Sequence, residues 1–232
     1  ITNEKVFTTA MHAAIRQAID GSIVILGITP DHGATGYGYI QTKQIFEANV
    51  FDAEIYDVCR FVEKPDADIA QQYLDAGNYF WNAGIFVLKA STWLGALESY
   101  QPDIAEAMRS AWHKRTIEAN SSTPFIRPGK KEFMKIPPKS IDYAVMEHCP
   151  GGNFPVKMVE LDAGWSDLGA WSAVWKSLPK DKDGNACRGD VILKDSRSNL
   201  VHAKNRLVSL VGVDDLIVIE TKDAVMVSHK LC

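Results

Sequence analysis

The chain has 232 residues, 46% of them hydrophobic, which is enough for a large domain or a domain and a half with a buried core. Its formal net charge is -4, and no basic run alternates with aromatic residues, so nucleic acid is not an expected partner. No apolar run approaches the roughly 18 to 20 residues that cross a bilayer. We therefore expect a cytoplasmic protein without a membrane partner.

The first elements alternate between helix and buried strand. Asn3 is placed to cap a helix over residues 4–19, whose apolar positions recur at helical spacing. The β-branched run over residues 22–28 then predicts a strand that is covered on both faces. A helix followed by a buried strand indicates an α/β sheet.

A loop rich in glycine and tyrosine over residues 29–40 leads into the next strand. Gly36 and Gly38 leave backbone N–H groups accessible to a ligand, and Tyr37 and Tyr39 offer flat walls with hydroxyl groups. The same residues also suit a plain β-turn with packed tyrosines. Both interpretations stay open at this point.

Two motifs in the first third of the chain place polar groups near strand ends. A strand over residues 55–63 ends where a Lys-Pro pair interrupts it, so Glu63 and Lys64 stand where α/β sheets collect ligand groups. An ordinary surface pair of Glu and Lys is the alternative. Asn82 lies within an apolar run and needs hydrogen-bond partners, which its own backbone turn or a ligand would supply.

Helices are expected after Ser91 and Ser140, which are placed as caps, and from Pro102 at a first helical position. The polar and basic segment over residues 114–135 predicts a mobile helix and loop with a solvated face. Asp142 falls in the first turn of the helix after Ser140. Its carboxylate is either a partner of the helix dipole or a ligand contact.

The last third of the chain combines one acidic motif with a run of short strands. Asp167 follows a strand over residues 154–161 and precedes a helix, so it either caps that helix or holds Mg²⁺ that also contacts substrate phosphates. Five short strands over residues 190–227 then indicate a small all-β segment suited to packing or oligomer contacts. Cysteines are few and far apart, which indicates ordinary thiols.

Linked motifs run through the chain in a fixed order. They are Gly27–Pro30 with Thr35–Ile40, Phe61–Pro65, Trp81–Phe86, Ser140–Glu147 and Gly164–Gly169. Together they resemble the bacterial mannose-1-phosphate guanylyltransferases (GDP-mannose pyrophosphorylases) of the sugar nucleotidyltransferase family. The resemblance implies an α/β fold with a Rossmann-like mixed-sheet nucleotidyltransferase core over residues 1–179. A C-terminal all-β, β-helix-like segment over residues 180–232 is implied after it.

The resemblance also implies a reaction, its partners and its site residues. GMP passes from GTP to mannose 1-phosphate, giving GDP-mannose and pyrophosphate with Mg²⁺, in a protein expected to be a homo-oligomer, namely a dimer. Lys64 and Asp167 are the implied catalytic residues. The implied roles are Tyr37 and Gly38 bordering the sugar, Glu63 accepting sugar hydroxyls, Asn82 contacting the sugar, Lys64 neutralising the sugar phosphate, and Asp167 as one of two metal carboxylates.

The sequence also departs from the family pattern. The glycine-rich, Arg-containing nucleotide loop and the first metal-binding Asp are absent, so we expect a fragment that is inactive alone. Ala34 and Ala83 stand where many relatives have Glu and Ser. Base specificity is not readable, and another hexose-1-phosphate nucleotidyltransferase or a noncatalytic sugar-phosphate-binding regulatory domain remains an alternative. A further alternative is a glycosidase that uses Glu63 and Asp167 as its two carboxylates, but a glycosidase would give Lys64 no role.

Overall fold

The computed structural model describes residues 1–43, 53–118 and 123–230. The chain forms two compact units, Ile1–Trp165 and Ser166–Cys232, and each is described by itself. The domain division expected between residues 179 and 180 stays a prediction. In the described ranges, no helix is both long and apolar enough to cross a membrane.

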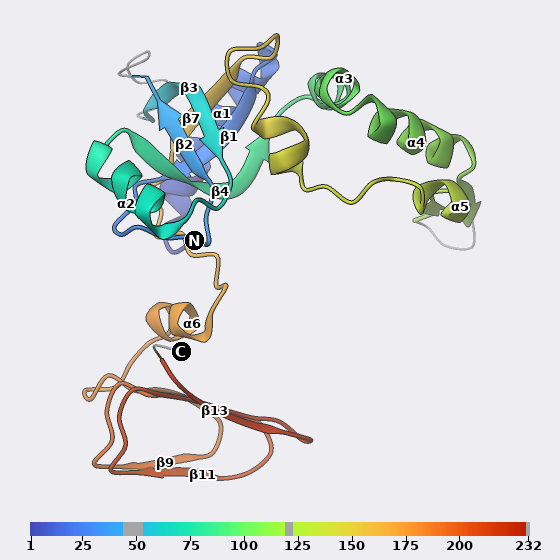
Figure 1. The fold of residues 1–232 in the computed structure, drawn as a ribbon. Helices are drawn as coiled ribbons and strands as arrows, with labels where there is room; N and C mark the ends of the chain where they lie inside the picture. Colours follow the sequence, from blue (N-terminus) through green and yellow to red (C-terminus); the bar gives the residue numbers. More distant parts are fainter. Residues whose placement is uncertain (44–52, 119–122, 231–232) are drawn as a thin grey trace. The chain divides into compact units, whose positions relative to one another are not determined.

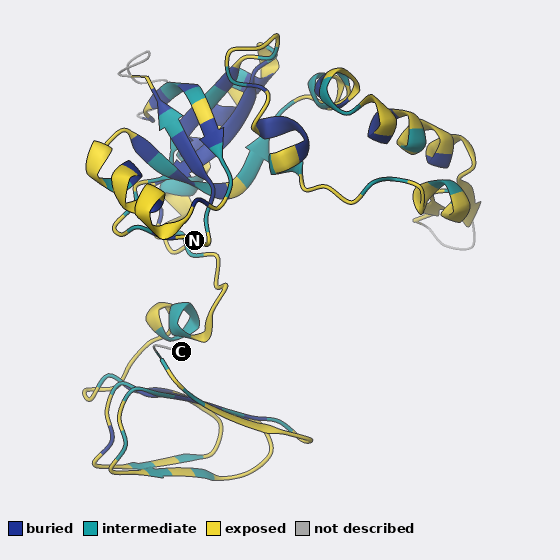
Figure 2. Cartoon of the chain, in the orientation of Figure 1, coloured by how far each residue is buried: buried dark blue, intermediate teal, exposed yellow. Residues whose placement is uncertain are grey.

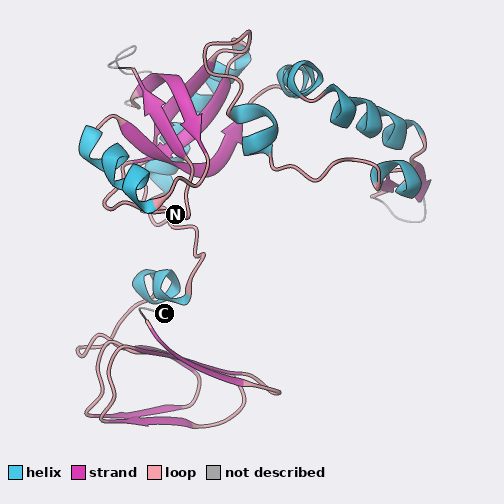
Figure 3. Cartoon of the chain, in the orientation of Figure 1, coloured by secondary structure: helices cyan, strands magenta, loops and turns pink. Residues whose placement is uncertain are grey.

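The first unit is a mixed sheet with helices (Figure 1, Figure 3). Its elements in chain order are α1 (Glu4–Ile19), β1 (Ile23–Ile28), β2 (Tyr39–Thr42), β3 (Ile55–Val62), α2 (Ala67–Ala76), β4 (Tyr79–Val87), α3 (Ala90–Tyr100), α4 (Pro102–His113), β5 (Thr116–Glu118), β6 (Phe125–Arg127), α5 (Lys130–Phe133), the π-helix η1 (Asp142–Met146) and β7 (Val156–Glu160).

The main sheet has the strand order β1-β4-β2-β3-β7 and closes on itself as a barrel. The β1–β7 pair is parallel, whereas β1–β4, β2–β3, β2–β4 and β3–β7 are antiparallel. The mixed sheet expected from the sequence is therefore confirmed. The antiparallel pairs matter for the site, because they bring the end of one strand next to the start of another. These strand ends and starts form one end of the barrel, which we call the edge of the main sheet.

Strand β1 is buried on both faces, as its apolar run predicts (Figure 2). Val24 and Leu26 pack in one cluster with the alanines of α1, while Ile23 and Ile25 pack in a second cluster with residues of α3, α4 and η1. The side chain of Asn3 accepts a hydrogen bond from the Val6 N–H at 3.2 Å, so the predicted cap of α1 is confirmed.

Three local predictions need correction. Helix α3 begins at Ala90 without a side-chain cap, so Ser91 is not its cap. The segment expected as a mobile helix and loop contains the hairpin β5–β6 and the short helix α5. The helix expected after Ser140 is the π-helix η1, whose N-cap is Ile141 and not Ser140.

The second unit begins with the helix α6 (Trp171–Ser177) and continues as short strands. They are β8 (Ala186–Arg188), β9 (Val191–Lys194), β10 (Leu200–Ala203), β11 (Val208–Val211), β12 (Leu216–Glu220) and β13 (Val225–His229). Parallel pairs join β8–β10–β12 and β9–β11, and β13 is antiparallel to β12. The predicted β-helix-like segment is confirmed, with β8 as a further strand that the sequence pattern did not predict.

The buried polar residues of this second unit stack between successive coils. Asn199 is fully buried, and its Nδ2 donates to Asn185 Oδ1 and to the Val213 carbonyl, each at 3.0 Å. Its Oδ1 accepts from the Leu216 N–H at 2.8 Å. These bonds tie three turns of the chain together, because Asn185 lies on the coil before Asn199, and Val213 and Leu216 lie on the coil after it.

Candidate functional site

The predicted sugar-contacting residues of the first unit meet where β2, β3 and β4 lie side by side. Strand β2 lies between the other two, and Tyr39 pairs with Val62 of β3 and with Trp81 of β4. Because both pairings are antiparallel, Gly38 lies next to Glu63 on one side and Asn82 on the other. The Asn82 N–H donates to the Gly38 carbonyl at 2.8 Å, which ties the two strands at this point.

Gly38 holds the space between these polar side chains open. A Cβ atom at Gly38 would lie 2.5 Å from Glu63 Oε2 and 3.3 Å from Asn82 Cβ. An ordinary side chain would therefore displace the Glu63 carboxylate and fill the place where a ligand could approach the backbone. The loop pattern predicted close ligand approach at this glycine, and the geometry is compatible with that role.

Lys64 occupies a left-handed backbone conformation, with φ at 48°. Its N–H donates to the Tyr37 carbonyl at 3.2 Å, so the turn after β3 is held against the loop before β2. Its Nζ lies 3.5 Å from Glu63 Oε1. The Lys64 side chain is 58% exposed, so its ammonium can turn toward a ligand, whereas the Glu63 side chain is only 9% exposed.

Burial raises the pKa of the Glu63 carboxyl above its usual value, and the negative charges of Asp142 and Glu147 raise it further. The Lys64 ammonium acts in the opposite direction and lowers this pKa. The Glu63 carboxylate thus has two further carboxylates and one ammonium near it. A ligand that offers hydroxyl groups to the carboxylates and a phosphate to Lys64 would satisfy both kinds of group.

The π-helix η1 and the residue after it supply two contacts that the sequence pattern did not predict. Asn82 Nδ2 donates to Asp142 Oδ1 at 3.2 Å, and the Glu63 N–H donates to Glu147 Oε1 at 3.1 Å. Both carboxylates come from the Ser140–Glu147 motif, whose sequence indicates a dipole partner or a ligand contact at Asp142 and no role for Glu147. The spacing of acidic residues on one helix gave a signal, but their partners lie far away in the sequence.

Tyr37 borders the group from the aromatic side. Its ring lies 4.9 Å from that of Trp81 and 5.7 Å from that of Trp165, measured between centroids. Trp81 is almost fully buried, and its Nε1 has no hydrogen-bond partner within the described part of the chain. Tyr37 is therefore held as a wall between two indole rings, as expected for a residue that borders a ligand.

Asp167 belongs to the second unit, so its position relative to Glu63 and Lys64 is not defined. Helix α6 begins at Trp171 and its N-cap is Ala170, so the interpretation of Asp167 as the N-cap of this helix is wrong. Over the described ranges, no group of three or more His, Cys, Asp or Glu side chains is arranged to hold a metal ion. Asp167 offers one exposed carboxylate, which suits Mg²⁺ only together with further oxygen ligands.

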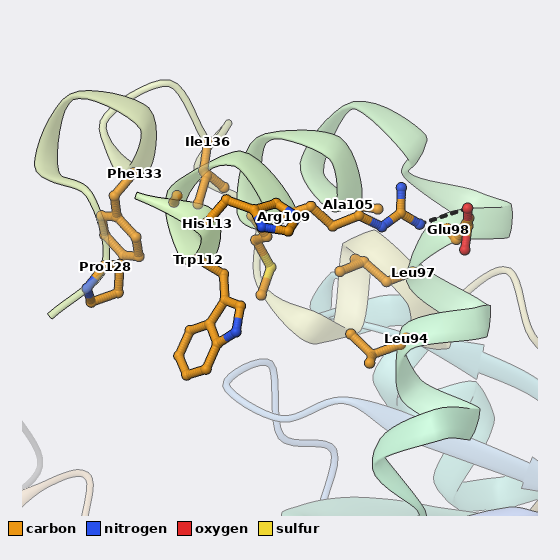
Figure 4. A pocket seen from close by; sticks show the side chains of 12 residues that line it. Leu94, Leu97, Glu98, Ala105, Arg109, Trp112, His113, Pro128, Phe133 and Ile136 are labelled. Carbon is orange, nitrogen blue, oxygen red and sulfur yellow. Dashed lines mark ion pairs between the residues drawn. The ribbon is translucent and has the colours of Figure 1, made fainter. Parts of the chain in front are cut away.

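A separate hollow of about 500 Å³ lies among α3, α4 and α5 (Figure 4). Its walls are mainly apolar, with Leu94, Trp112 and Phe133 among them, and its ion pair joins Arg109 to Glu98 at 2.6 Å. None of the predicted site residues lines it. Because its walls are mainly apolar, this hollow offers fewer hydrogen-bond partners for a sugar phosphate than the edge of the main sheet.

The chain thus combines an α/β unit, which has polar side chains at one edge of its sheet, with a β-helix-like unit. The family model described as nucleotidyl transferase matches residues 1–184, and a model described as MannoseP isomerase/GMP-like beta-helix domain matches residues 189–230. The chain belongs to the nucleotidyl transferase family.

Individual relatives agree with this assignment. A mannose-1-phosphate guanylyltransferase from Escherichia coli (strain K12) is 39% identical over 99% of this chain and 46% of its own length. One from Klebsiella pneumoniae is 39% identical over 99% of this chain and 47% of its own length. The chain thus spans about half the length of these curated relatives.

A solved structure resembles the chain over nearly its whole length. It is described as a mannose-1-phosphate geranyltransferase from Thermus thermophilus and superimposes with a TM-score of 0.80 at 27% identity. The match covers 98% of this chain and 62% of that one. The combination of mixed-sheet core and β-helix-like unit therefore occurs in another protein in the same order.

Proposed function

We propose that the whole protein is a mannose-1-phosphate guanylyltransferase and that this chain supplies its sugar-phosphate-binding portion. The proposed reaction transfers GMP from GTP to mannose 1-phosphate, giving GDP-mannose and pyrophosphate. The names of the curated relatives support these substrates. The observation that carries the proposal is the grouping of Glu63, Lys64 and Asn82 around Gly38.

The grouped side chains have the chemistry that a sugar phosphate requires. A carboxylate at Glu63 accepts hydrogen bonds from hydroxyls, the Asn82 carboxamide both donates and accepts, and the Lys64 ammonium is a point charge for a phosphate. An oxygen of the sugar phosphate attacks the α-phosphorus of GTP, and the bond to the leaving pyrophosphate breaks. Lys64 orients and partly neutralises the attacking phosphate, because phosphoryl transfer depends on positioning and charge neutralisation.

We further propose that Asp167 is one of the Mg²⁺ ligands of the whole protein. Mg²⁺ is commonly held by one or two carboxylates together with substrate phosphates. The exposed carboxylate of Asp167 supplies one such ligand, in the second unit. When bound, the ion would supply positive charge at the transferring phosphate.

A binding experiment on this chain tests the proposal. We expect mannose 1-phosphate to bind in isothermal titration calorimetry and GTP not to bind. Lys64→Asn removes the charge and keeps a residue type that tolerates positive φ, so the fold should be preserved. We expect this variant to bind mannose 1-phosphate roughly tenfold or more weakly, the size of effect that loss of one charge-assisted contact produces.

Controls separate this result from a general effect of charge. Lys43 is exposed and lies just after the opposite end of β2 from Gly38, so Lys43→Asn should bind mannose 1-phosphate as the unmodified chain does. If the unmodified chain bound glucose 1-phosphate more tightly than mannose 1-phosphate, glucose 1-phosphate would be the proposed substrate instead. Absence of any sugar-phosphate binding, or absence of pyrophosphate release by the full-length protein with GTP and Mg²⁺, would overturn it.

We also propose that the whole protein is a cytoplasmic homodimer. Strand β13 is at the edge of the sheet β13-β12-β10-β8, and its Val225 and Val227 side chains are 57% and 61% exposed. Such an edge favours pairing with a second chain. Sedimentation of the chain should show a dimer that Val227→Lys dissociates, and an unaltered monomer in both cases would contradict the proposal.

A further inference from the structure

We propose that Asp142 is a positioning residue that fixes the Asn82 carboxamide, so that the site selects ligands with neighbouring donor and acceptor hydroxyls. The inference rests on the proposed function of this edge as a sugar-phosphate site. It gives a role to the Ser140–Glu147 motif, which the reaction scheme above leaves unused.

Two hydrogen bonds determine which way the Asn82 carboxamide faces. Its Oδ1 accepts from the Gly84 N–H at 2.9 Å, and its Nδ2 donates to Asp142 Oδ1 at 3.2 Å. Turning the amide over would set Nδ2 against the Gly84 donor and Oδ1 against the Asp142 carboxylate. Because both contacts would then be repulsive, only one orientation satisfies both partners.

The backbone around Asn82 leaves little freedom for another arrangement. Asn82 is held in β4 by its N–H bond to the Gly38 carbonyl, and Gly84 has a φ of 69°, which turns its N–H toward the Asn82 side chain. Asp142 belongs to η1, whose Ala144, Val145 and Met146 are buried in the main core. The carboxylate is therefore presented from a fixed element.

The fixed orientation determines what a ligand meets. After the two bonds are made, one N–H and one oxygen lone pair of the Asn82 amide remain for a ligand. The Glu63 carboxylate lies on the other side of Gly38, and in its ionised form it can accept hydrogen bonds but cannot donate one. Its backbone is tied to the same motif by the bond from the Glu63 N–H to Glu147 Oε1. The Ser140–Glu147 motif thus positions both hydroxyl-contacting residues, which favours a polyhydroxy ligand over a bare phosphate.

A pair of variants separates the hydrogen bond from the negative charge. Asp142→Asn keeps an acceptor oxygen for Asn82 Nδ2, whereas Asp142→Ala removes it. We expect Asp142→Ala to bind mannose 1-phosphate about tenfold more weakly, since a lost positioning hydrogen bond has about this effect. Inorganic phosphate should bind both variants as it binds the unmodified chain. Asp142→Asn should recover most of the mannose 1-phosphate affinity.

A control and a ligand-free measurement make each outcome decisive. Asp103→Ala removes an exposed carboxylate from the first turn of α4 and should change nothing. The two side-chain N–H signals of Asn82 in ¹H–¹⁵N spectra should be well separated in the wild type and in Asp142→Asn, and should merge toward solvent values in Asp142→Ala. Unchanged Asn82 signals in Asp142→Ala would overturn the inference even without ligand.

Failure of the inference is distinguishable from failure of the proposed function. If the wild type binds mannose 1-phosphate and folded Asp142→Ala binds it equally well, the inference is wrong and the function stands. If the wild type binds no sugar phosphate, the function is wrong, and the Asn82 signals alone decide whether Asp142 fixes the amide. Equal weakening of mannose 1-phosphate and inorganic phosphate would show a general charge effect and overturn the inference.

Discussion

Gly38 and Glu63 are packed so closely that a single added carbon at Gly38 would lie 2.5 Å from Glu63 Oε2. We therefore expect Gly38→Ala to push the carboxylate aside and weaken mannose 1-phosphate binding roughly tenfold or more, the effect of losing a hydrogen bond to a charged group. Stability should change little, because the displaced atom is at the end of a flexible side chain. Calorimetric titration and thermal melts measure the two effects.

Gly36 provides the matched control for this substitution. A Cβ atom at Gly36 would meet nothing within 4 Å, so Gly36→Ala should leave affinity and melting temperature unchanged. If Gly38→Ala bound the sugar phosphate as tightly as Gly36→Ala, the space in front of Gly38 would not be part of the site.

Glu63→Gln should make the chain more stable at neutral pH while it weakens ligand binding. The pKa of Glu63 is raised in the folded state, mainly by burial. At pH values between the unfolded and the folded pKa, the folded chain therefore keeps a proton that the unfolded chain has lost. The contribution of Glu63 to stability is therefore greatest below its unfolded pKa and falls as the pH rises through the folded pKa. Melting temperatures from about pH 4 to about pH 7 should fall less steeply for Glu63→Gln.

An exposed glutamate on α4 serves for comparison with Glu63. Glu106→Gln should follow the pH dependence of the unmodified chain, because Glu106 is exposed. An identical slope for Glu63→Gln and wild type above the usual carboxyl pKa would show that Glu63 does not titrate as the structure indicates.

Glu220 in the second unit should give stability a pH dependence opposite to that of Glu63. Its buried Oε2 accepts from the N–H groups of Lys204, Asn205 and Arg206 at 2.8, 2.6 and 3.2 Å, and Arg206 Nη1 lies 3.1 Å from Oε1. These donors lower the pKa of Glu220. Its stabilising contribution is present above the unfolded pKa and is lost as the pH falls through the folded pKa.

The substitution Glu220→Gln tests this pH dependence. It should lower the melting temperature at neutral pH, because the NH₂ group of the amide would face the N–H groups that now donate to the carboxylate. It should also reduce the loss of stability on acidification. Asp190→Asn, at an exposed position in the same unit, is the control and should do neither. A neutral-pH melting temperature that Glu220→Gln leaves unchanged would contradict the prediction.

Asn199→Leu should destabilise the second unit by about 2 kcal/mol or more, because the Val213 carbonyl and the Leu216 N–H each lose a hydrogen bond worth about 1 kcal/mol or more. The Asn185 Oδ1 loses the bond from Asn199 Nδ2 but keeps the one from the backbone N–H of residue 199. Chemical denaturation followed by circular dichroism measures the change. Asn205→Leu makes the same substitution at an exposed position. If both variants lowered the free energy of unfolding equally, the buried hydrogen bonds of Asn199 would not be the cause.

Local patterns predicted some elements closely. The cap at Asn3 and the apolar spacing after it defined α1, and the run over residues 22–28 contains β1. Both depend on interactions within a few residues or on a continuous apolar run. The hairpin β5–β6 was missed because its short strands are exposed and carry no alternation of buried and exposed residues.

Sequence alone determined the class of protein and the residue types at the sheet edge, since motifs and their order are local properties. It predicted Tyr37, Gly38, Glu63, Lys64 and Asn82 as ligand groups, a role that stays a prediction, and Asp167 remains a proposed metal ligand. Only the tertiary structure showed that antiparallel register brings Gly38 between Glu63 and Asn82, and that Asp142 reaches Asn82 across 60 residues of sequence. Such contacts depend on strand pairing and core packing, because neither periodicity nor propensity records which distant residues meet.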